Sequence, residues 1–159
     1  MDFRLLYAII LTLMPVTELR VGLPLGIIYA KDVGLPVILI SMIILLVNIL
    51  LIFFVFYFLD NLHHLFMKLK FYRKFFEKIL RRIQKKVDKF ENRHPSMEFL
   101  MLVLFVGIPI PGTGVWSGVL ISWLLGLERK RSILAMMAGV LISGTIIFLG
   151  TIGFIGLLS

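Results

Sequence analysis

The feature that most constrains this chain is an apolar run from Pro36 to Leu59 that contains no charged residue. A second run without charge extends from Ser132 to Ser159. Each run is longer than the ~20 residues that an α-helix needs to cross the hydrocarbon core of a bilayer. The sequence therefore predicts an all-α membrane protein with transmembrane helices over residues 36–59 and 132–158.

The composition agrees with a membrane location, since 60% of the 159 residues are hydrophobic and a soluble domain usually contains about 45–50% apolar residues. Lys and Arg outnumber Asp and Glu by 17 to 9, which gives a net charge of +8. Of these basic residues, 11 lie between Lys68 and Arg93, and 3 more are Arg129, Lys130 and Arg131. Because this charge lies between apolar blocks, it favours contact with anionic lipid headgroups over nucleic acid.

Two further apolar blocks, over residues 5–30 and 99–127, are interrupted in the middle. The interrupting residues are mostly prolines and glycines, with one acid and one base: Pro15, Glu18, Arg20, Gly22 and Pro24 in the first block, and Gly107, Pro109, Pro111, Gly112 and Gly114 in the second. Proline removes a helical hydrogen bond, and clustered glycines let the backbone reverse. Each block then divides into two arms of roughly 11–13 residues, which rise only ~18 Å and reach mid-bilayer. We expect re-entrant helical hairpins over 3–31 and 98–127; a single kinked helix in each block is the alternative.

The basic loops indicate how these blocks are oriented. Residues 60–97 and 128–131 hold 14 of the 17 basic residues. The positive-inside rule places both segments in the cytoplasm, which requires block 99–127 to leave the membrane on the side from which it entered. The same rule places both termini outside. The resulting fold is a single membrane domain, 1–159, of two inverted repeats, 1–59 and 98–159, each with a hairpin and a spanning helix.

The segment over 60–97 joins the two repeats. Its apolar residues recur at alternating intervals of three and four from Leu62 to Phe90, a spacing that is interrupted only by Arg73 and is typical of an amphipathic helix. Lys and Arg flank the apolar face, so the sequence predicts a long basic cytoplasmic helix that binds anionic lipids of the inner leaflet through Lys68 to Arg93. A solvated connector without a role in substrate binding is the alternative.

Glu18 and Arg20 are the charged residues inside an otherwise apolar block. An ionisable group at mid-bilayer costs ~2.5–3.5 kcal/mol on insertion scales unless it faces protein or water. A local ion pair that stabilises the hairpin tip would explain both residues. We favour a functional interpretation, in which Arg20 binds an anionic group and Glu18 takes up and releases a proton.

The tip of the second hairpin is the other candidate site. Consecutive small residues expose backbone N–H groups, and a helix that begins near Val115 would point its positive end at the tip, so together they could bind an anion. Gly114 and Gly118 also suit close helix packing, and Asn48 lies centrally in the first span, where it can bond another helix or face substrate. The candidate substrate- or ion-binding residues are Glu18, Arg20, Pro24, Asn48, Pro109, Pro111, Gly112, Thr113, Gly114 and Gly118.

The sequence contains no recognisable catalytic constellation, cofactor motif or metal site. Three histidines, His63, His64 and His94, lack metal-binding spacing with any carboxylate, and the chain has no cysteine. We therefore expect no enzyme activity, no cofactor, no metal and no nucleic-acid partner. The expected partners are the lipid bilayer and a small ion or amphiphilic substrate, and homo-oligomerisation is left open.

The segments ELRVGLPLG, from Glu18, and IPIPGTGVWSG, from Ile108, resemble the two signature segments of the putative small multidrug export family of prokaryotic membrane proteins. That family is distantly similar to the DedA superfamily, whose members share paired re-entrant hairpins. The resemblance covers nearly the whole chain and implies transport across the plasma membrane, with ion coupling or movement of a phosphate-bearing lipid. DedA proteins typically carry arginine near the second hairpin, where this chain has Thr113, so lipid-phosphate chemistry does not transfer by position.

Together these features predict a small multi-pass transporter that couples protons to the movement of an anionic or amphiphilic substrate, through a midplane site between the two hairpins. The alternatives are a lipid flippase or scramblase of DedA type, a non-transporting membrane scaffold whose basic helix recruits partners, and a membrane enzyme that acts on lipids. Tolerance of neutral substitutions at Glu18 and Arg20 would favour the scaffold.

Overall fold

The computed structural model describes residues 3–66, 95–110 and 112–158, so the predicted linker helix over Lys68 to Arg93 lies outside the described residues. Within these ranges the chain forms helices and no strand, which confirms the predicted all-α class. The helices are α1 (Arg4–Leu13), α2 (Glu18–Val33), α3 (Val37–Phe66), α5 (Pro95–Gly107), α6 (Val115–Leu124) and α7 (Arg129–Leu158).

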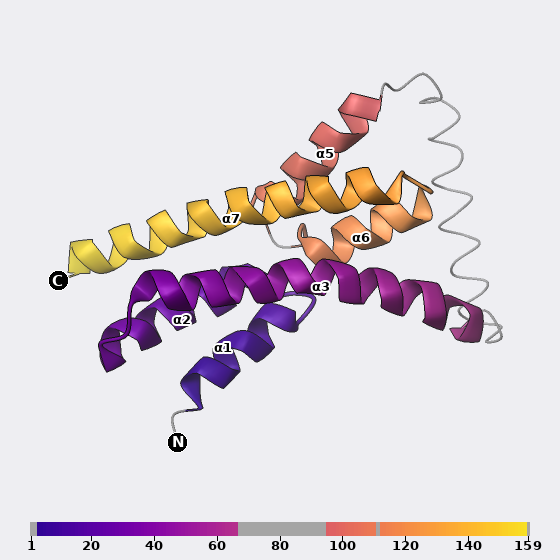
Figure 1. Cartoon of the computed structure of the whole chain (residues 1–159). Coiled ribbons are helices and arrows are strands. Elements are labelled where there is room, and N and C mark those ends of the chain that lie inside the picture. The colour runs from indigo at the N-terminus through magenta and orange to yellow at the C-terminus, as the bar shows by residue number, and fades with distance from the viewer. Residues whose placement is uncertain (1–2, 67–94, 111, 159) are drawn as a thin grey trace.

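Two long helices, α3 and α7, form the axis of the molecule and run antiparallel to each other (Figure 1). Their segments Val37–Asn61 and Arg129–Leu157 are each long and apolar enough to cross a membrane. Large apolar side chains such as Leu46, Phe53 and Ile146 lie exposed on their outer faces. Exposure of this kind suits contact with lipid tails, because a soluble protein would bury such a surface.

The helix boundaries extend beyond the apolar runs. Helix α3 continues through residues 60–66, which we had assigned to the linker, and α7 begins at Arg129 instead of residue 132. Helix α5 begins at Pro95, ahead of the expected hairpin start at 98. The reason is that Lys and Arg, as at the start of α7, are good helix formers and that proline, as at the start of α5, is favoured in the first turn. The limit of the hydrophobic run therefore does not fix the end of the helix.

Helices α1 and α2 form one antiparallel pair. At the end opposite the turn, an ion pair between Arg4 and Asp32 at 3.0 Å joins the two helices. The pair packs closely, since a Cβ atom on Gly22 would lie 1.9 Å from the Thr12 hydroxyl oxygen. The irregular turn is shorter than we predicted, because the helix resumes at Glu18 and keeps Arg20 and Pro24 inside its 16 residues. Proline is tolerated there because it deprives only one carbonyl, that of Arg20, of its helical donor.

Helices α5 and α6 form the second pair, joined by residues 108–114. This pair is more open than the first, because α5 packs mainly along α7 while α6 contacts α3, α5 and α7. The contact between α5 and α7 is close, since a Cβ atom on Gly139 would lie 2.9 Å from the Val103 carbonyl oxygen. The turns of the two pairs meet near the middle of the α3–α7 axis, and the pairs approach it from opposite ends (Figure 1).

The hydrophobic core lies between α2, α3, α6 and α7. Its fully buried side chains include Leu23, Ile44, Ile52, Val119 and Met136. These residues hold the two turns against the long helices, so the polar side chains of the turns are fixed inside an apolar surrounding.

Candidate functional site

Glu18 connects the two turns. Its side chain comes from the first residue of α2 and is only 6% exposed. Oε2 accepts a hydrogen bond from the backbone N–H of Val115 at 3.1 Å, and Oε1 accepts one from the N–H of Trp116 at 3.2 Å. These N–H groups begin α6 and have no partner inside that helix, so the carboxylate caps the positive end of α6 from another part of the chain.

Arg20 makes the second link between the turns. Its Nη2 atom donates to the backbone carbonyl of Thr113 and lies 3.0 Å from the Thr113 hydroxyl oxygen. The same hydroxyl is 2.8 Å from the carbonyl oxygens of Ile108 and Ile110, between which its proton is shared. Thr113 therefore ties its own turn together and at the same time holds the guanidinium group.

The carbonyl end of α1 is satisfied by other elements as well. The Trp116 indole N–H donates to the Leu13 carbonyl at 3.0 Å, and Asn48 Nδ2 lies 3.5 Å from the Thr12 carbonyl oxygen. The Thr17 hydroxyl donates to the Leu11 carbonyl at 2.5 Å. In a hydrocarbon surrounding, each unpaired backbone group would cost several kcal/mol, and these contacts remove that cost at the end of α1.

The close contact between Glu18 and the second turn leaves no room for a side chain at position 114. A Cβ atom on Gly114 would lie 1.9 Å from Glu18 Oε2, so any side chain at this position would displace the carboxylate. Glu18 itself has a φ of 40°, in the left-handed region. This conformation costs a residue other than glycine on the order of 1–3 kcal/mol. The two hydrogen bonds between its carboxylate and the start of α6 hold that conformation in place.

The predicted site residues separate into two groups. Glu18, Arg20, Thr113 and Gly114 meet at the turns, and Asn48 reaches the same place from α3. Of the others, Pro24 lies inside α2, while Pro109 and Gly112 lie on the outer part of the second turn, where a Cβ atom on Gly112 would meet nothing within 4 Å.

Gly118 packs away from the polar contacts, because a Cβ atom there would lie 2.8 Å from a methyl group of Val106 on α5. Pro111 lies outside the described residues.

The sequence-based interpretation missed how the anion-binding turn is used. We expected the N–H groups of the second turn and of the start of α6 to be free for a substrate, whereas the Glu18 carboxylate binds those of Val115 and Trp116. It also did not single out Trp116, whose indole donates a hydrogen bond to the end of α1. The helix-terminus pattern could have suggested this pairing, since a carboxylate is a preferred partner of a helix N-terminus.

A small cavity lies beside this contact. It is lined by Glu18, Leu19 and Arg20 from α2, by Asn48 from α3, by Gly114, and by Val106, Val140 and Ser143 from α5 and α7. Ser143 was not predicted as a site residue. Its position at the centre of the segment Arg129–Leu157 mirrors that of Asn48, which lies next to the centre of Val37–Asn61. The cavity therefore lies at mid-depth of both long helices.

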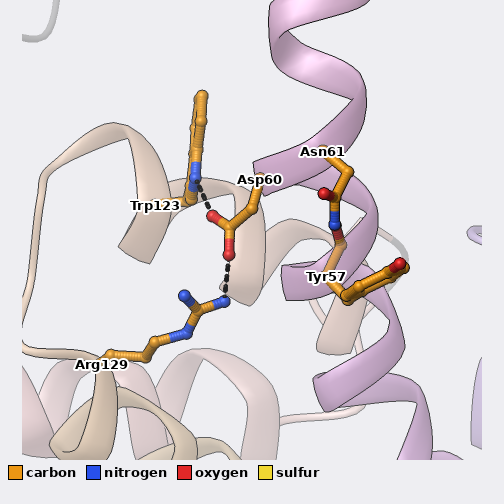
Figure 2. Close-up of polar contacts among 5 residues, drawn as sticks. All are labelled: Tyr57, Asp60, Asn61, Trp123 and Arg129. Atoms are coloured by element: carbon orange, nitrogen blue, oxygen red, sulfur yellow. Dashed lines mark hydrogen bonds and ion pairs between the residues drawn. The ribbon is translucent and has the colours of Figure 1, made fainter.

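A separate polar cluster lies near the C-terminal end of α3 (Figure 2). Asp60 accepts a hydrogen bond from the Trp123 indole N–H at 3.0 Å and forms an ion pair with Arg129 at 2.6 Å. The Arg129 guanidinium carbon also lies 4.7 Å from the centre of the Phe56 ring. This cluster ties the end of α6 and the start of α7 to α3, and it contains none of the predicted site residues.

Among the residues that the structure describes, no group of three or more His, Asp or Glu side chains could hold a metal ion. At the turns, the charged side chains instead bind backbone groups of the other turn. A carboxylate and a guanidinium group hold backbone donors and acceptors that an anionic ligand and its counter-charge could also bind.

Comparison with known protein families supports a transport role. A family model described as "Putative small multi-drug export protein" matches residues 18–146, which include Glu18, Arg20, Thr113 and most of the long helices. No curated protein and no solved structure matches the chain. With two helices able to cross a membrane, this match indicates a membrane protein. The chain thus belongs to the putative small multi-drug export protein family.

Proposed function

We propose that this protein is a proton-coupled membrane transporter of an anionic or amphiphilic substrate, with its site where the two turns meet. The observation that carries the proposal is the binding of the Glu18 carboxylate to the Val115 and Trp116 N–H groups across the two turns. Charged groups at the middle of a membrane are costly and usually serve function. Broken helices whose ends face each other at mid-depth are typical of transporter sites.

The orientation that we propose makes the two helix pairs re-entrant hairpins of an inverted repeat. It rests on the short arms, on the approach of the pairs from opposite ends of α3 and α7, and on the basic residues near Arg129. In this orientation the 128–131 loop and the 60–97 linker face the cytoplasm and both termini face outside. The basic linker would then bind anionic lipids of the inner leaflet.

The proposed mechanism is an exchange of anions at the start of α6. Protonation of Glu18 removes the negative charge that binds the Val115 and Trp116 N–H groups, and so releases them. An anionic group of the substrate then takes the place of the carboxylate, with Arg20 turning from the Thr113 carbonyl towards it. Release of the substrate lets Glu18 lose its proton and return. One proton and one anion therefore move together.

A substrate of this kind can be a small anion or the headgroup of a lipid, as in a flippase or scramblase of DedA type. Both present the same anionic oxygens to Arg20 and to the helix N-terminus. We propose no enzymatic step, because an exchange of hydrogen-bond partners does not break a bond in the substrate.

The test is flux in proteoliposomes that contain the purified full chain, with simple anions, cationic drugs and fluorescent phosphate lipids as separate probes. We expect a pH gradient to accelerate the movement of an anionic probe by the wild-type protein. Glu18→Gln should keep probe binding and lose the acceleration, because glutamine cannot exchange a proton. Arg20→Gln should weaken binding itself.

The matched control is Glu98→Gln on α5, which changes a carboxylate that lies away from the two turns. It should leave the gradient dependence unchanged. Gradient-driven flux in Glu18→Gln at the wild-type rate would contradict proton coupling at this site. Wild-type behaviour of both Glu18→Gln and Arg20→Gln in every assay would favour a scaffold over a transporter.

A further inference from the structure

Asn48 is a buried polar residue whose hydrogen bonding is incomplete. Its side chain is 1% exposed, at mid-depth of α3. Nδ2 faces the Thr12 carbonyl at 3.5 Å, which fixes the orientation of the amide, and Oδ1 accepts no hydrogen bond from the part of the chain that the structure describes. A buried acceptor without a donor costs about 1–3 kcal/mol. An apolar residue of the same size would avoid that cost.

Asn48 lines the small cavity beside Glu18, together with Ser143 and Arg20. The space open to the centre of a water molecule there is about 10 Å³. That is close to the volume at which a cavity begins to hold one water, which also needs two to four polar partners. The carboxylate, the amide oxygen and the Ser143 hydroxyl supply such partners.

We propose that this cavity binds a single water molecule that carries the proton to Glu18. The water donates one hydrogen bond to Asn48 Oδ1 and one towards the Glu18 carboxylate, and the Ser143 hydroxyl completes its coordination. Asn48 and Ser143 are then positioning residues, because they orient the water and do not themselves exchange the proton.

The surroundings favour a neutral ligand over a metal cation. Apart from Glu18, Arg20 is the one charged side chain among the described residues that line the cavity. The guanidinium group and the N-terminus of α6 both oppose a cation, and the hydrogen bonds from Val115 and Trp116 already balance the carboxylate. Water keeps this charge balance and can both donate and accept.

The proton step is simple. An excess proton forms an O–H bond with the water oxygen as the O–H bond that points to Glu18 breaks. The released proton forms an O–H bond with a Glu18 oxygen, so that neutral water remains and the site holds no cation. This step rests on the proposed function, whereas the presence of the water does not.

The water is tested on the full chain in lipid nanodiscs by NMR, with nitrogen-15 placed in the three asparagines, Asn48, Asn61 and Asn92. The Asn48→Leu variant assigns the Asn48 side-chain signals by their loss. We expect a cross-relaxation peak between the Asn48 amide protons and a long-lived water. Absence of this peak in the folded wild-type protein would overturn the water site, as would a shift of the Asn48 signals on adding sodium ions.

Ser143→Val provides a variant that fills the cavity with methyl groups and leaves Asn48 and Glu18 in place. Its matched control is Ser41→Val, at a serine of similar burial that bonds the Val37 carbonyl on α3. We expect Ser143→Val to lose both the water peak and the gradient-driven flux, and Ser41→Val to keep both. Loss of the peak with wild-type gradient-driven flux would refute the proton relay.

The two proposals can fail separately. If the water peak is present but Glu18→Gln keeps gradient-driven flux, the proton-coupled function is wrong and the hydration site stands. If the peak is absent and Glu18→Gln loses the gradient dependence, the function stands and the proton reaches Glu18 by another route.

Discussion

At the scale of single residues, Glu18 performs two tasks that depend on each other. Its backbone adopts a left-handed conformation at the start of α2, and its carboxylate holds the start of α6. The hydrogen bonds to a charged acceptor, each about 1.5–3 kcal/mol, are large enough to maintain a backbone strain of similar size. Loss of the carboxylate charge therefore weakens the link between the turns and favours a change of backbone conformation at the same time.

Two glycines of the second turn allow this link to be tested. In Gly114→Ala the new methyl group would lie 1.9 Å from Glu18 Oε2 and must expel the carboxylate. In Gly112→Ala the methyl group meets nothing within 4 Å, and only the φ of 89° opposes it. We expect Gly112→Ala to lose about 1–2 kcal/mol of stability. Gly114→Ala should lose more, by about the value of one charge-assisted hydrogen bond.

The measurement is thermal unfolding of the two variants in the same detergent, followed by circular dichroism. The double variant Gly114→Ala with Glu18→Gln serves as the control, since the alanine should add less further loss once the charge is gone. Equal unfolding temperatures for Gly112→Ala and Gly114→Ala would show that the close approach of Glu18 contributes nothing to stability.

At the scale of elements, the two helix pairs are held in different ways. The α1–α2 pair closes on itself through Arg4 and Asp32, whereas α6 is tied to α3 through the Trp123–Asp60 contact (Figure 2). Helix α5 packs along α7 instead. The two helices of the first pair are thus joined directly to each other, whereas those of the second pair are held mainly by their neighbours.

The stability that the Asp60 cluster contributes can be compared with that of a local ion pair. Asp60→Asn removes the charge that pairs with Arg129 across two helices and keeps an acceptor for Trp123. We expect a loss of about 1 kcal/mol, at the upper end for partly exposed pairs, and a smaller loss at high salt. Glu128→Gln, which breaks the 2.8 Å pair with Arg131 inside one segment, should cost less. Chemical unfolding at two salt concentrations distinguishes them, and equal losses would contradict the tie between α3 and α7.

Much of this element structure could be predicted from the sequence, because proline and glycine positions break a helix locally. The start of α6 at Val115 was predicted from the glycines before it. The early restart of α2 at Glu18 could not be predicted in this way, since Pro24 looked like part of the break. Whether an internal proline ends a helix depends on the packing of neighbouring helices, which local sequence does not contain.

At the scale of the whole molecule, the prediction that the two turns meet came from short hairpins that enter from opposite sides. The candidate residues came from the cost of placing Glu18 and Arg20 in an apolar block. That argument selects the residues but not their partners. Asn48 was visible as a polar residue at mid-span, whereas Ser143 resembles any other serine in an apolar helix. The cavity depends on which faces of α3 and α7 point inward, and this is decided by tertiary packing.

The proposed membrane orientation gives a prediction for the full chain. Single cysteines at Ser96 and Lys130, before α5 and at the start of α7, should react with an impermeant maleimide only from the cytoplasm. A cysteine at Lys31 should react only from outside, because it lies at the open end of the other helix pair. The native chain has no cysteine, so labelling reports the introduced site alone. Reaction of Ser96→Cys and Lys130→Cys from opposite sides would replace the re-entrant pair with a spanning helix.

The two halves of the chain supply hydrogen-bond partners for each other's helix ends, and this affects how such a protein can be assembled. Helix α1 obtains a partner for its Leu13 carbonyl from Trp116, and α6 obtains a partner for its first N–H groups from Glu18. Neither half alone can satisfy these groups inside a bilayer. We therefore expect two halves made as separate polypeptides to be stable in a membrane only as a complementary pair.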